Sequence, residues 1–243
     1  MSDLYGEDLA YIHHAGFSGF SERAAPGLLA HFREAGITDG RVVDLGCGGG
    51  TWLGALGEAG YEAVGIEPSP HLVAIARETA PDATLITASA HGAAFPSCDA
   101  VTALGEALCY MPTDATSPPP LARTFVHIHE ALSVGGLLAF DLIIGGEAPS
   151  LTGTGGRTGD DWAVLSEVVE DEAARRLRRT VTIFRAVDGV YRRSQETHQQ
   201  HLFTHGEIEA ALMGAGFTEI VAADSYGDAR MLPRRRAFFA RKG

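Results

Sequence analysis

The stretch RVVDLGCGGGTW, residues 41–52, decides the fold. An apolar run leads into Asp44, and four glycines then surround Cys47. Glycine tolerates positive φ angles and lets a backbone approach a ligand closely. A glycine-rich turn between a first strand and its helix binds nucleotide-like ligands at the carboxyl edge of a parallel sheet. The stretch therefore predicts an α/β fold with a ligand at this turn.

The glycine spacing narrows the ligand class. The dinucleotide pattern G-x-G-x-x-G needs a glycine at position 51, which is Thr51, and the phosphate-loop pattern needs a lysine that is absent. What remains is Gly46-x-Gly48-x-Gly50 with Asp44 upstream. Because the loop has no basic residue and follows a carboxylate, it suits a cationic ligand that carries an ammonium or a sulfonium.

A second acid follows the next apolar run. Glu67 ends the run EAVGIE, 19 residues beyond Gly48. In open α/β folds an acid at this place accepts hydrogen bonds from ribose hydroxyls, and one carboxylate can accept two of them.

Strand-like runs alternate with helical patterns along the first 145 residues. Each strand is nearly continuously apolar, as in parallel sheets covered on both faces. We predict a Rossmann-like, seven-stranded, mostly parallel sheet with helices on both faces. The predicted strands are 41–46, 62–67, 83–89, 98–105 and 137–144. The predicted helices are 21–35, 50–60, 68–80 and 121–132, the last stopped by Gly135–Gly136.

The pattern changes after the fifth strand. Residues 145–160 form a glycine-rich segment that we interpret as a flexible connector. Strand-like runs over 162–170, 177–187 and 190–203, with a turn at Asp188–Gly189, predict an inserted antiparallel meander. A helix over 205–215, opened by a capping box, and a final antiparallel hairpin complete the chain.

Composition excludes several partners. The net charge is −12, whereas proteins that grip a phosphate backbone are usually basic, so no nucleic acid is expected. The arginine runs at 174–179 and 233–242 are interpreted as solvated strand faces and ends. No apolar run reaches the roughly 20 residues that cross a bilayer, so no membrane is expected. The acidic N-terminus does not read as a signal peptide, which predicts a cytoplasmic protein with three reduced cysteines.

A metal site is not expected. His198, His201 and His205 are spaced as H-x-x-H-x-x-x-H, which would share one face of a helix. Here the spacing falls on a strand that runs into a helix cap, so the three side chains are not predicted to converge.

Four motifs in order resemble the class I S-adenosylmethionine-dependent methyltransferases. They are VVDLGCGGG, VGIEPSPHLVAIAR, CDAVTALGEALCYM and LSVGGLLAFDL, within residues 37–145. The segment DLAYIHHAGFSGF resembles the helical lid of the small-molecule type, and the meander resembles its substrate-covering sheet. The resemblance implies four parts: an N-terminal lid with the first helices (1–36), a cofactor-binding core (37–145), an inserted covering sheet (146–204) and a C-terminal completion of the core (205–243).

The resemblance also implies S-adenosyl-L-methionine as cofactor and assigns residues to it. The glycines would pass beneath the methionyl part, Asp44 would order the loop, Glu67 would bind the ribose, and Pro68 would lie beside the adenine. Where the family often has an acid near the adenine, this chain has Ser89 and Ala90. The full set of expected cofactor contacts is Asp44, Gly46, Cys47, Gly48, Gly50, Glu67, Pro68, Ser89, Ala90, Leu104, Gly105 and Tyr11.

The acceptor side is less defined. Residues 104–108 lack the N/D-P-P-Y/F motif of many enzymes that methylate bases or amides. The candidate bases are Glu106 and His198, the latter with Glu196. The alternative for Glu106 is a structural carboxylate, and the alternative for His198 and Glu196 is an ordinary exposed strand face. A base is needed only if the acceptor must lose a proton. Further residues could line the pocket or belong to the core: Tyr11, His13, His14, Phe17 and Trp162.

The function predicted from these features is methyl transfer to O or N of a small molecule. The alternatives are another reaction of the sulfonium cofactor on the same fold, or a non-catalytic cofactor-binding or regulatory subunit. The sequence gives no oligomeric state.

Overall fold

The central sheet has seven strands in the order β11-β14-β6-β4-β1-β2-β3. The structure is a computed structural model that describes residues 4–94, 96–112 and 115–243. The five strands from β6 to β3 are parallel, and β14 pairs antiparallel with both β6 and β11. The strands are β1 (Arg41–Leu45), β2 (Glu62–Glu67), β3 (Thr84–Thr87), β4 (Cys98–Ala103), β6 (Leu132–Ile143), β11 (Phe217–Ala223) and β14 (Arg235–Lys242). The predicted fold class is confirmed.

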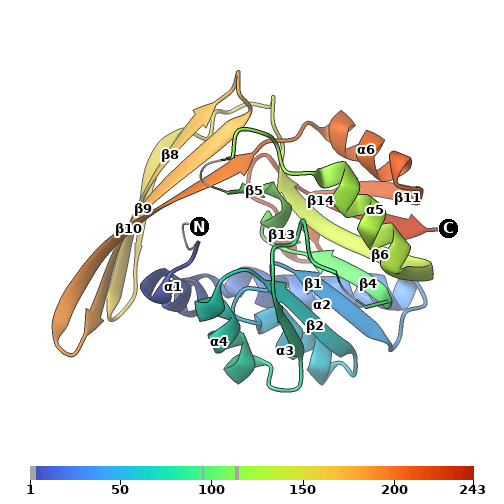
Figure 1. Ribbon diagram of the computed structural model, residues 1–243, viewed down its shortest axis with the longest axis horizontal. Coiled ribbons are helices and arrows are strands. Elements are labelled where there is room, and N and C mark those ends of the chain that lie inside the picture. The colour runs from blue at the N-terminus through green and yellow to red at the C-terminus, as the bar shows by residue number, and fades with distance from the viewer. Residues whose placement is uncertain (1–3, 95, 113–114) are drawn as a thin grey trace.

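Helices cover both faces of this sheet (Figure 1). On one face lie α2 (Gly19–Glu34) and α3 (Thr51–Glu58), and on the other lie α5 (Leu121–Ala131) and α6 (His205–Gly214). Between β2 and β3 runs α4 (Pro70–Thr79), whose N-cap Ser69 accepts a hydrogen bond from the backbone of Leu72 as predicted. The capping box at the start of α6 is also present.

Two hydrophobic cores form because neighbouring strand residues point to opposite faces. Val42 and Ala100 belong to the core beneath α2 and α3, whereas Val43 and Val101 belong to the core beneath α5 and α6. A continuous apolar strand is therefore what a sheet covered on both faces requires.

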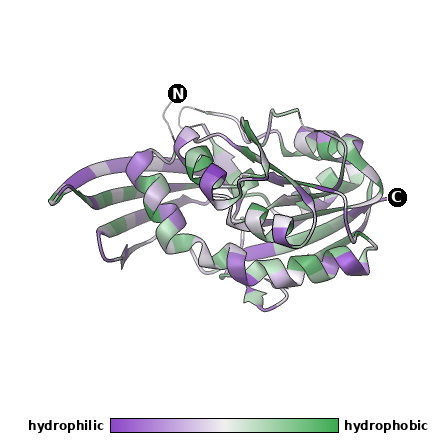
Figure 2. Cartoon of the chain, turned by 90° about the horizontal axis from the view of Figure 1, so that it is seen from below, coloured by the Kyte–Doolittle hydropathy of each residue, from purple (hydrophilic) through white to green (hydrophobic). Residues whose placement is uncertain are grey.

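A second, antiparallel sheet has the order β5-β10-β9-β8-β7; β7 to β10 follow β6 in the chain, whereas β5 precedes it. Its strands are β5 (Tyr110–Met111), β7 (Gly153–Thr158), β8 (Trp162–Asp171), β9 (Arg176–Val187) and β10 (Val190–His201). Its long strands carry both hydrophobic and hydrophilic residues, and β10 is hydrophilic throughout residues 192–201 (Figure 2). The interpretation of residues 145–160 as a flexible connector is wrong for β7, because its backbone pairs with β8 without needing large side chains.

Two predicted boundaries also differ. Gly135–Gly136 do not stop a helix: α5 ends at Ala131, and β6 begins at Leu132. Between β4 and β6 the register shifts, from Cys98 opposite Leu132 to Ala100 opposite Leu137, so the two glycines lie in an irregular stretch of strand.

The arginine run after residue 233 is not a solvated end. The Arg234 side chain is 1% exposed, and its Nη2 lies 2.7 Å from Oε1 of Glu170, itself 2% exposed. The next arginine, Arg235, pairs with Glu106. Buried charges need partners, and these pairs connect the residue before β14 to β8, and the first residue of β14 to the loop after β4.

The first helix, α1 (Glu7–Phe17), lies between the second sheet and α4 (Figure 1). Its Leu9 and Ile12 pack with Trp162 and Ile183 in a third cluster, which makes Trp162 a core residue. No helix among the described residues is long and apolar enough to span a membrane.

Close packing at Gly27 generates the first prediction. A Cβ at this position of α2 would lie 2.5 Å from the carbonyl carbon of Tyr226. We expect Gly27→Ala to lower the free energy of unfolding by about 1–3 kcal/mol, because the rigid backbone of Tyr226 must move. The matched control is Gly57→Ala in α3, where a Cβ has nothing within 4 Å; it should stabilise by up to about 1 kcal/mol. Chemical denaturation of both variants tests this, and equal effects would contradict it.

Candidate functional site

The glycine loop turns back on the end of β2. The backbone N–H groups of Gly46 and Cys47 donate to the carbonyl of Ile66, at 2.7 and 3.2 Å. The three motif glycines have φ angles of +77°, +55° and +82°, in the region that favours glycine. A Cβ on Gly46 would lie 2.6 Å from Cβ of Ala107, whereas one on Gly48 would meet nothing closer than His13, at 3.7 Å. Packing of the chain therefore excludes a side chain at Gly46, whereas a Cβ at Gly48 would be in ordinary contact with the His13 ring.

Glu67 is 5% exposed and braces this loop. One carboxylate oxygen accepts the Gly48 N–H at 3.1 Å, and the other accepts the Ser69 N–H at 2.8 Å. Burial raises the pKa of Glu67 to about 7, against the two backbone hydrogen bonds, which lower it. Each oxygen keeps a lone pair, so the carboxylate can accept two further hydrogen bonds.

Asp44 is fixed by a hydrogen-bonded chain across three elements. The Trp52 indole N–H donates to the Thr102 hydroxyl at 3.0 Å, which donates to Asp44 at 2.6 Å. Burial raises the pKa of Asp44 to about 7. This arrangement holds one carboxylate oxygen, and the other has no hydrogen-bond partner among the described residues.

A third buried carboxylate shapes the turn after β4. The oxygens of Asp141, on β6, accept the N–H groups of Gly105 and Glu106 at 2.9 and 3.0 Å. The Tyr226 hydroxyl donates to the same carboxylate at 3.3 Å. Burial raises the pKa of Asp141 to about 7. These bonds hold Glu106 at a φ of +54°, a conformation that is uncommon for a non-glycine residue.

Glu106 itself is bound in ion pairs. Its carboxylate pairs with Arg235 of β14, and with Arg179 of β9 at 3.5 Å. Protonation would leave these guanidiniums without their counter-charge, so the arrangement disfavours a role as a base. The carboxylate instead connects the core to the second sheet.

His198 is 2% exposed, so the alternative of an exposed strand face is wrong. Its Nε2 lies 3.0 Å from Oε2 of Glu196, which also accepts the Tyr5 N–H at 2.9 Å. The other oxygen of Glu196 accepts the Gly6 N–H at 3.0 Å. An ionised carboxylate only accepts, so we assign the His198 proton to Nε2 and the lone pair to Nδ1.

Tyr5 joins the two halves of this region. Its ring centroid lies 4.9 Å from those of His13 and His198, and its hydroxyl lies 2.9 Å from that of Tyr110. Its carbonyl accepts the Ser69 hydroxyl at 2.7 Å. Sequence reasoning missed Tyr5, Tyr110, Asp141, Arg179 and Arg235. Only Asp141, an acid within an apolar strand, gave a usable signal.

The remaining predicted residues are placed as follows. Tyr11 is directed elsewhere: its hydroxyl donates to Asp161 at 2.9 Å, and the Arg185 guanidinium lies 3.8 Å from its ring centroid. The Ser89 hydroxyl accepts the His91 N–H at 3.4 Å. The loops after β1, β3 and β4 bury Cys47, Ala90 and Leu104. Pro68 is exposed.

The three histidines of the metal pattern do not converge. His198 pairs with Glu196, His201 stacks edge-on against Phe203, and His205 pairs with Glu209. Within residues 4–94, 96–112 and 115–243 there is no group of three or more His, Cys, Asp or Glu side chains that could hold a metal.

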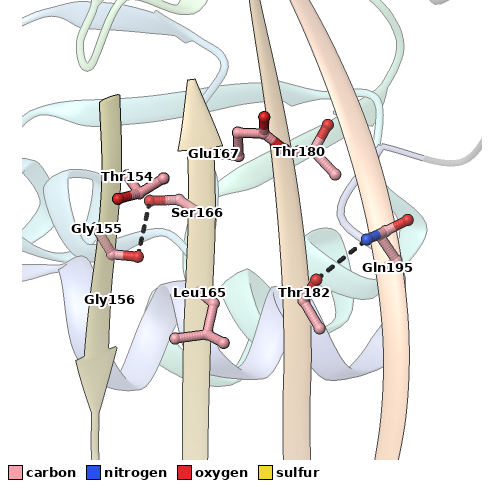
Figure 3. Close-up of a pocket in the computed structure, with 9 residues that line it drawn as sticks. All are labelled: Thr154, Gly155, Gly156, Leu165, Ser166, Glu167, Thr180, Thr182 and Gln195. Carbon is pink, nitrogen blue, oxygen red and sulfur yellow. Dashed lines mark hydrogen bonds between the residues drawn. The ribbon is translucent and has the colours of Figure 1, made fainter. Parts of the chain in front are cut away.

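A separate hollow lies on the second sheet (Figure 3). Within it, Ser166 donates to the carbonyl of Gly155 at 3.4 Å, and Gln195 donates to Thr182 at 3.1 Å. Its lining is Thr154, Gly155, Gly156, Leu165, Ser166, Glu167, Thr180, Thr182 and Gln195. With a single charged side chain and no nucleophile–base pair, it offers no evident chemistry.

Comparison with known proteins supports the resemblance of the motifs. A family profile described as "Methyltransferase domain" matches residues 42–136. The chain is 28% identical over 220 residues to "Putative methyltransferase GWCH70_2453" of Geobacillus sp. (strain WCH70), covering 83% of this chain and 84% of that protein.

Solved structures share the fold over nearly the whole chain. The sugar N-methyltransferase KedS8 from Streptoalloteichus sp. ATCC 53650 superposes with a TM-score of 0.78 at 22% identity, covering 100% of this chain and 97% of that one. The amino pentose methyltransferase CalS10 from Micromonospora echinaspora, with S-adenosylmethionine bound, gives 0.76 at 21% identity and 100% of both chains. The chain thus carries a methyltransferase domain over residues 42–136, and the four ordered motifs, the 28% identical relative and the shared fold support a class I S-adenosylmethionine-dependent methyltransferase.

Proposed function

We propose that this enzyme transfers the methyl group to O or N of a small-molecule acceptor. The observation that carries the proposal is the position of Tyr5. Its carbonyl is bound by Ser69, next to Glu67, and its amide is bound by Glu196, next to His198. The single residue Tyr5 thus connects the expected cofactor side to the expected acceptor side, and the N-terminal segment covers both. A site that the N-terminal segment covers in this way suits a small molecule better than a protein surface or a duplex.

The residues around the glycine loop fit the cofactor. The two oxygens of Glu67 retain acceptor capacity for the two ribose hydroxyls, and Gly48 presents no side chain to the methionyl part that would pass over the loop. Asp44 offers a carboxylate to the cationic end. We keep the expected contacts of Gly46, Cys47, Gly50, Pro68, Ser89, Ala90, Leu104 and Gly105 as part of this proposal, without Tyr11. When bound, S-adenosylmethionine supplies an electrophilic methyl group on a sulfonium.

On the acceptor side, His198 is the better candidate for a base. Glu196 orients its ring and holds the proton on Nε2, so Nδ1 can accept a proton from the acceptor. Glu106 would keep the loop after β4 in place. Because KedS8 and CalS10 are named as sugar and amino pentose methyltransferases, amino sugars are the first acceptors to test.

Two measurements test the proposed function. Calorimetry with S-adenosylmethionine and with its demethylated product tests binding. Turnover with a labelled methyl donor and a panel of amino sugars tests transfer. Binding without transfer to any small molecule would favour a non-catalytic subunit, and cofactor consumption without methylation would indicate another reaction of the sulfonium.

The second prediction concerns Glu67. A ribose that donates two hydrogen bonds needs the ionised carboxylate, and the pKa of Glu67 is about 7. Raising the pH from 6 to 8 should therefore strengthen cofactor binding by about tenfold. At pH 8, Glu67→Gln should weaken binding by roughly 2–4 kcal/mol and flatten the pH dependence, since charged hydrogen bonds contribute about 1.5–3 kcal/mol each. Part of the pH dependence of binding can remain in this variant, because the pKa of Asp44 is also about 7.

The matched control for this titration is Glu62→Gln. Glu62 is exposed at the start of the same strand and pairs with Arg41. It should keep the affinity and the pH profile of the parent enzyme. Unchanged affinity in Glu67→Gln would overturn the ribose assignment.

The third prediction concerns Gly48. Gly48→Ala should weaken cofactor binding about tenfold or more, because the loop would present a Cβ to the methionyl part that is proposed to pass over it. The control Gly36→Ala also places alanine at a positive φ, +78°, but in open space. Both should lose similar stability in thermal unfolding. Normal binding by Gly48→Ala would mean that the loop is only a turn.

The fourth prediction concerns His198. If its Nδ1 accepts a proton, His198→Asn should lower kcat by about 10²–10⁴-fold and leave cofactor affinity nearly unchanged. His205→Asn, beyond the end of the same strand, is the control. The measurement is kcat against pH on the acceptor found by the turnover assay. A parent-like profile in His198→Asn would leave alignment of the two reactants as the mechanism.

A further inference from the structure

Gln200 on β10 is a buried amide without a hydrogen-bond partner. The residue is 0% exposed, and neither its side-chain oxygen nor its nitrogen is bonded to any residue that the structure describes. Most buried polar groups in native proteins are hydrogen-bonded, and one that is not weakens the fold. Two unused atoms on one side chain therefore require an explanation.

The position of Gln200 places it beside the proposed acceptor site. Side chains alternate along a strand, so Gln200 shares a face of β10 with Glu196 and His198. In register it lies between Leu177 of β9 and Tyr110 of β5. The Tyr110 ring, in turn, lies 5.8 Å from that of His198, measured between centroids. Gln200 is thus the next polar residue along the wall that carries the candidate base.

The surroundings of this wall carry little net charge. The nearby guanidiniums of Arg179 and Arg235 face two carboxylates: Glu106 pairs with both arginines, and Asp141 lies 3.5 Å from Arg235. The Glu196 carboxylate on the same wall is bonded by the N–H groups of Tyr5 and Gly6 and by the His198 ring, and the hydroxyls of Tyr5 and Tyr110 can donate or accept. No unpaired charge among these residues would attract an ionic group of an acceptor.

The chemistry of an amide selects among acceptor groups. A carboxylate could use only the NH₂ end of Gln200, and an ammonium only its oxygen, which would leave the other end unsatisfied. A hydroxyl both donates and accepts, and two neighbouring hydroxyls can satisfy both ends at once. We propose that Gln200 is a specificity-determining residue that hydrogen-bonds hydroxyl groups of the acceptor, so that the substrates are hydroxylated small molecules. This inference rests on the proposed function.

A second consequence does not depend on catalysis. An unbonded buried amide destabilises the unliganded enzyme, so an apolar side chain of similar length should relieve the cost. Gln200→Met should therefore melt at a higher temperature than the parent, while losing acceptor recognition. Such opposite effects on stability and activity are typical of binding residues.

The experiment uses amino sugars, each paired with an analogue that lacks a hydroxyl. For the parent enzyme we expect kcat/KM to fall by about 10–100-fold when the recognised hydroxyl is removed. In Gln200→Met the hydroxylated acceptor should lose a similar factor, and removal of the hydroxyl should then have little further effect. Cofactor affinity should be unchanged. Gln195→Met, on the opposite face of β10, is the control and should behave as the parent in every assay.

The outcomes distinguish a failure of this inference from a failure of the proposed function. Failure of the parent to bind S-adenosylmethionine would contradict the proposed function. Cofactor binding with turnover confined to acceptors without hydroxyls would overturn the inference alone. Equal kcat/KM of parent and Gln200→Met on both members of a pair, or a lower melting temperature of Gln200→Met, would overturn it as well.

Discussion

The burial of carboxylates at the carboxyl edge of the sheet constrains the rest of the structure. Asp44, Glu67 and Asp141 lie on β1, β2 and β6, and each is at most 5% exposed. A buried charge is costly unless hydrogen bonds compensate it. The loop after β1 supplies its Gly48 N–H to Glu67, and the turn after β4 supplies two N–H groups to Asp141. Each loop at this edge is therefore shaped by the acid that it must satisfy.

The same requirement attaches the second sheet and the N-terminus to the core. Glu196 receives two backbone N–H groups from residues 5–6, which fixes the position of this segment ahead of α1. Glu106 needs Arg235 and Arg179, one from each sheet. The hydrophobic clusters bring the elements together, but these directional bonds fix their register and orientation.

The sequence predicted what local patterns encode. The alternation of strands and helices, the caps at Ser69 and Thr204, and the positions of Asp44 and Glu67 follow from spacing along the chain. The partners of charged residues do not, because Arg234 and Glu170 are 64 residues apart and meet only in the folded chain. Strand β7 was not predicted for a different reason. A glycine-rich segment has no hydrophobic periodicity, and this one is a strand because its backbone pairs with β8. Tyr5 lies in no motif at all.

The distribution of charge also suggests where catalysis arises. In the proposed site, carboxylates at the cofactor side would stabilise a sulfonium that is already present before the reaction, so they would strengthen binding without lowering the barrier. Their favourable effect even diminishes as the positive charge leaves sulfur. Rate must then come from holding the acceptor atom in line, which can supply about 7–11 kcal/mol. A wall with cancelled charges and neutral groups such as Tyr110 and Gln200 suits that task, because it orients an acceptor by hydrogen bonds without adding a field that opposes the transfer.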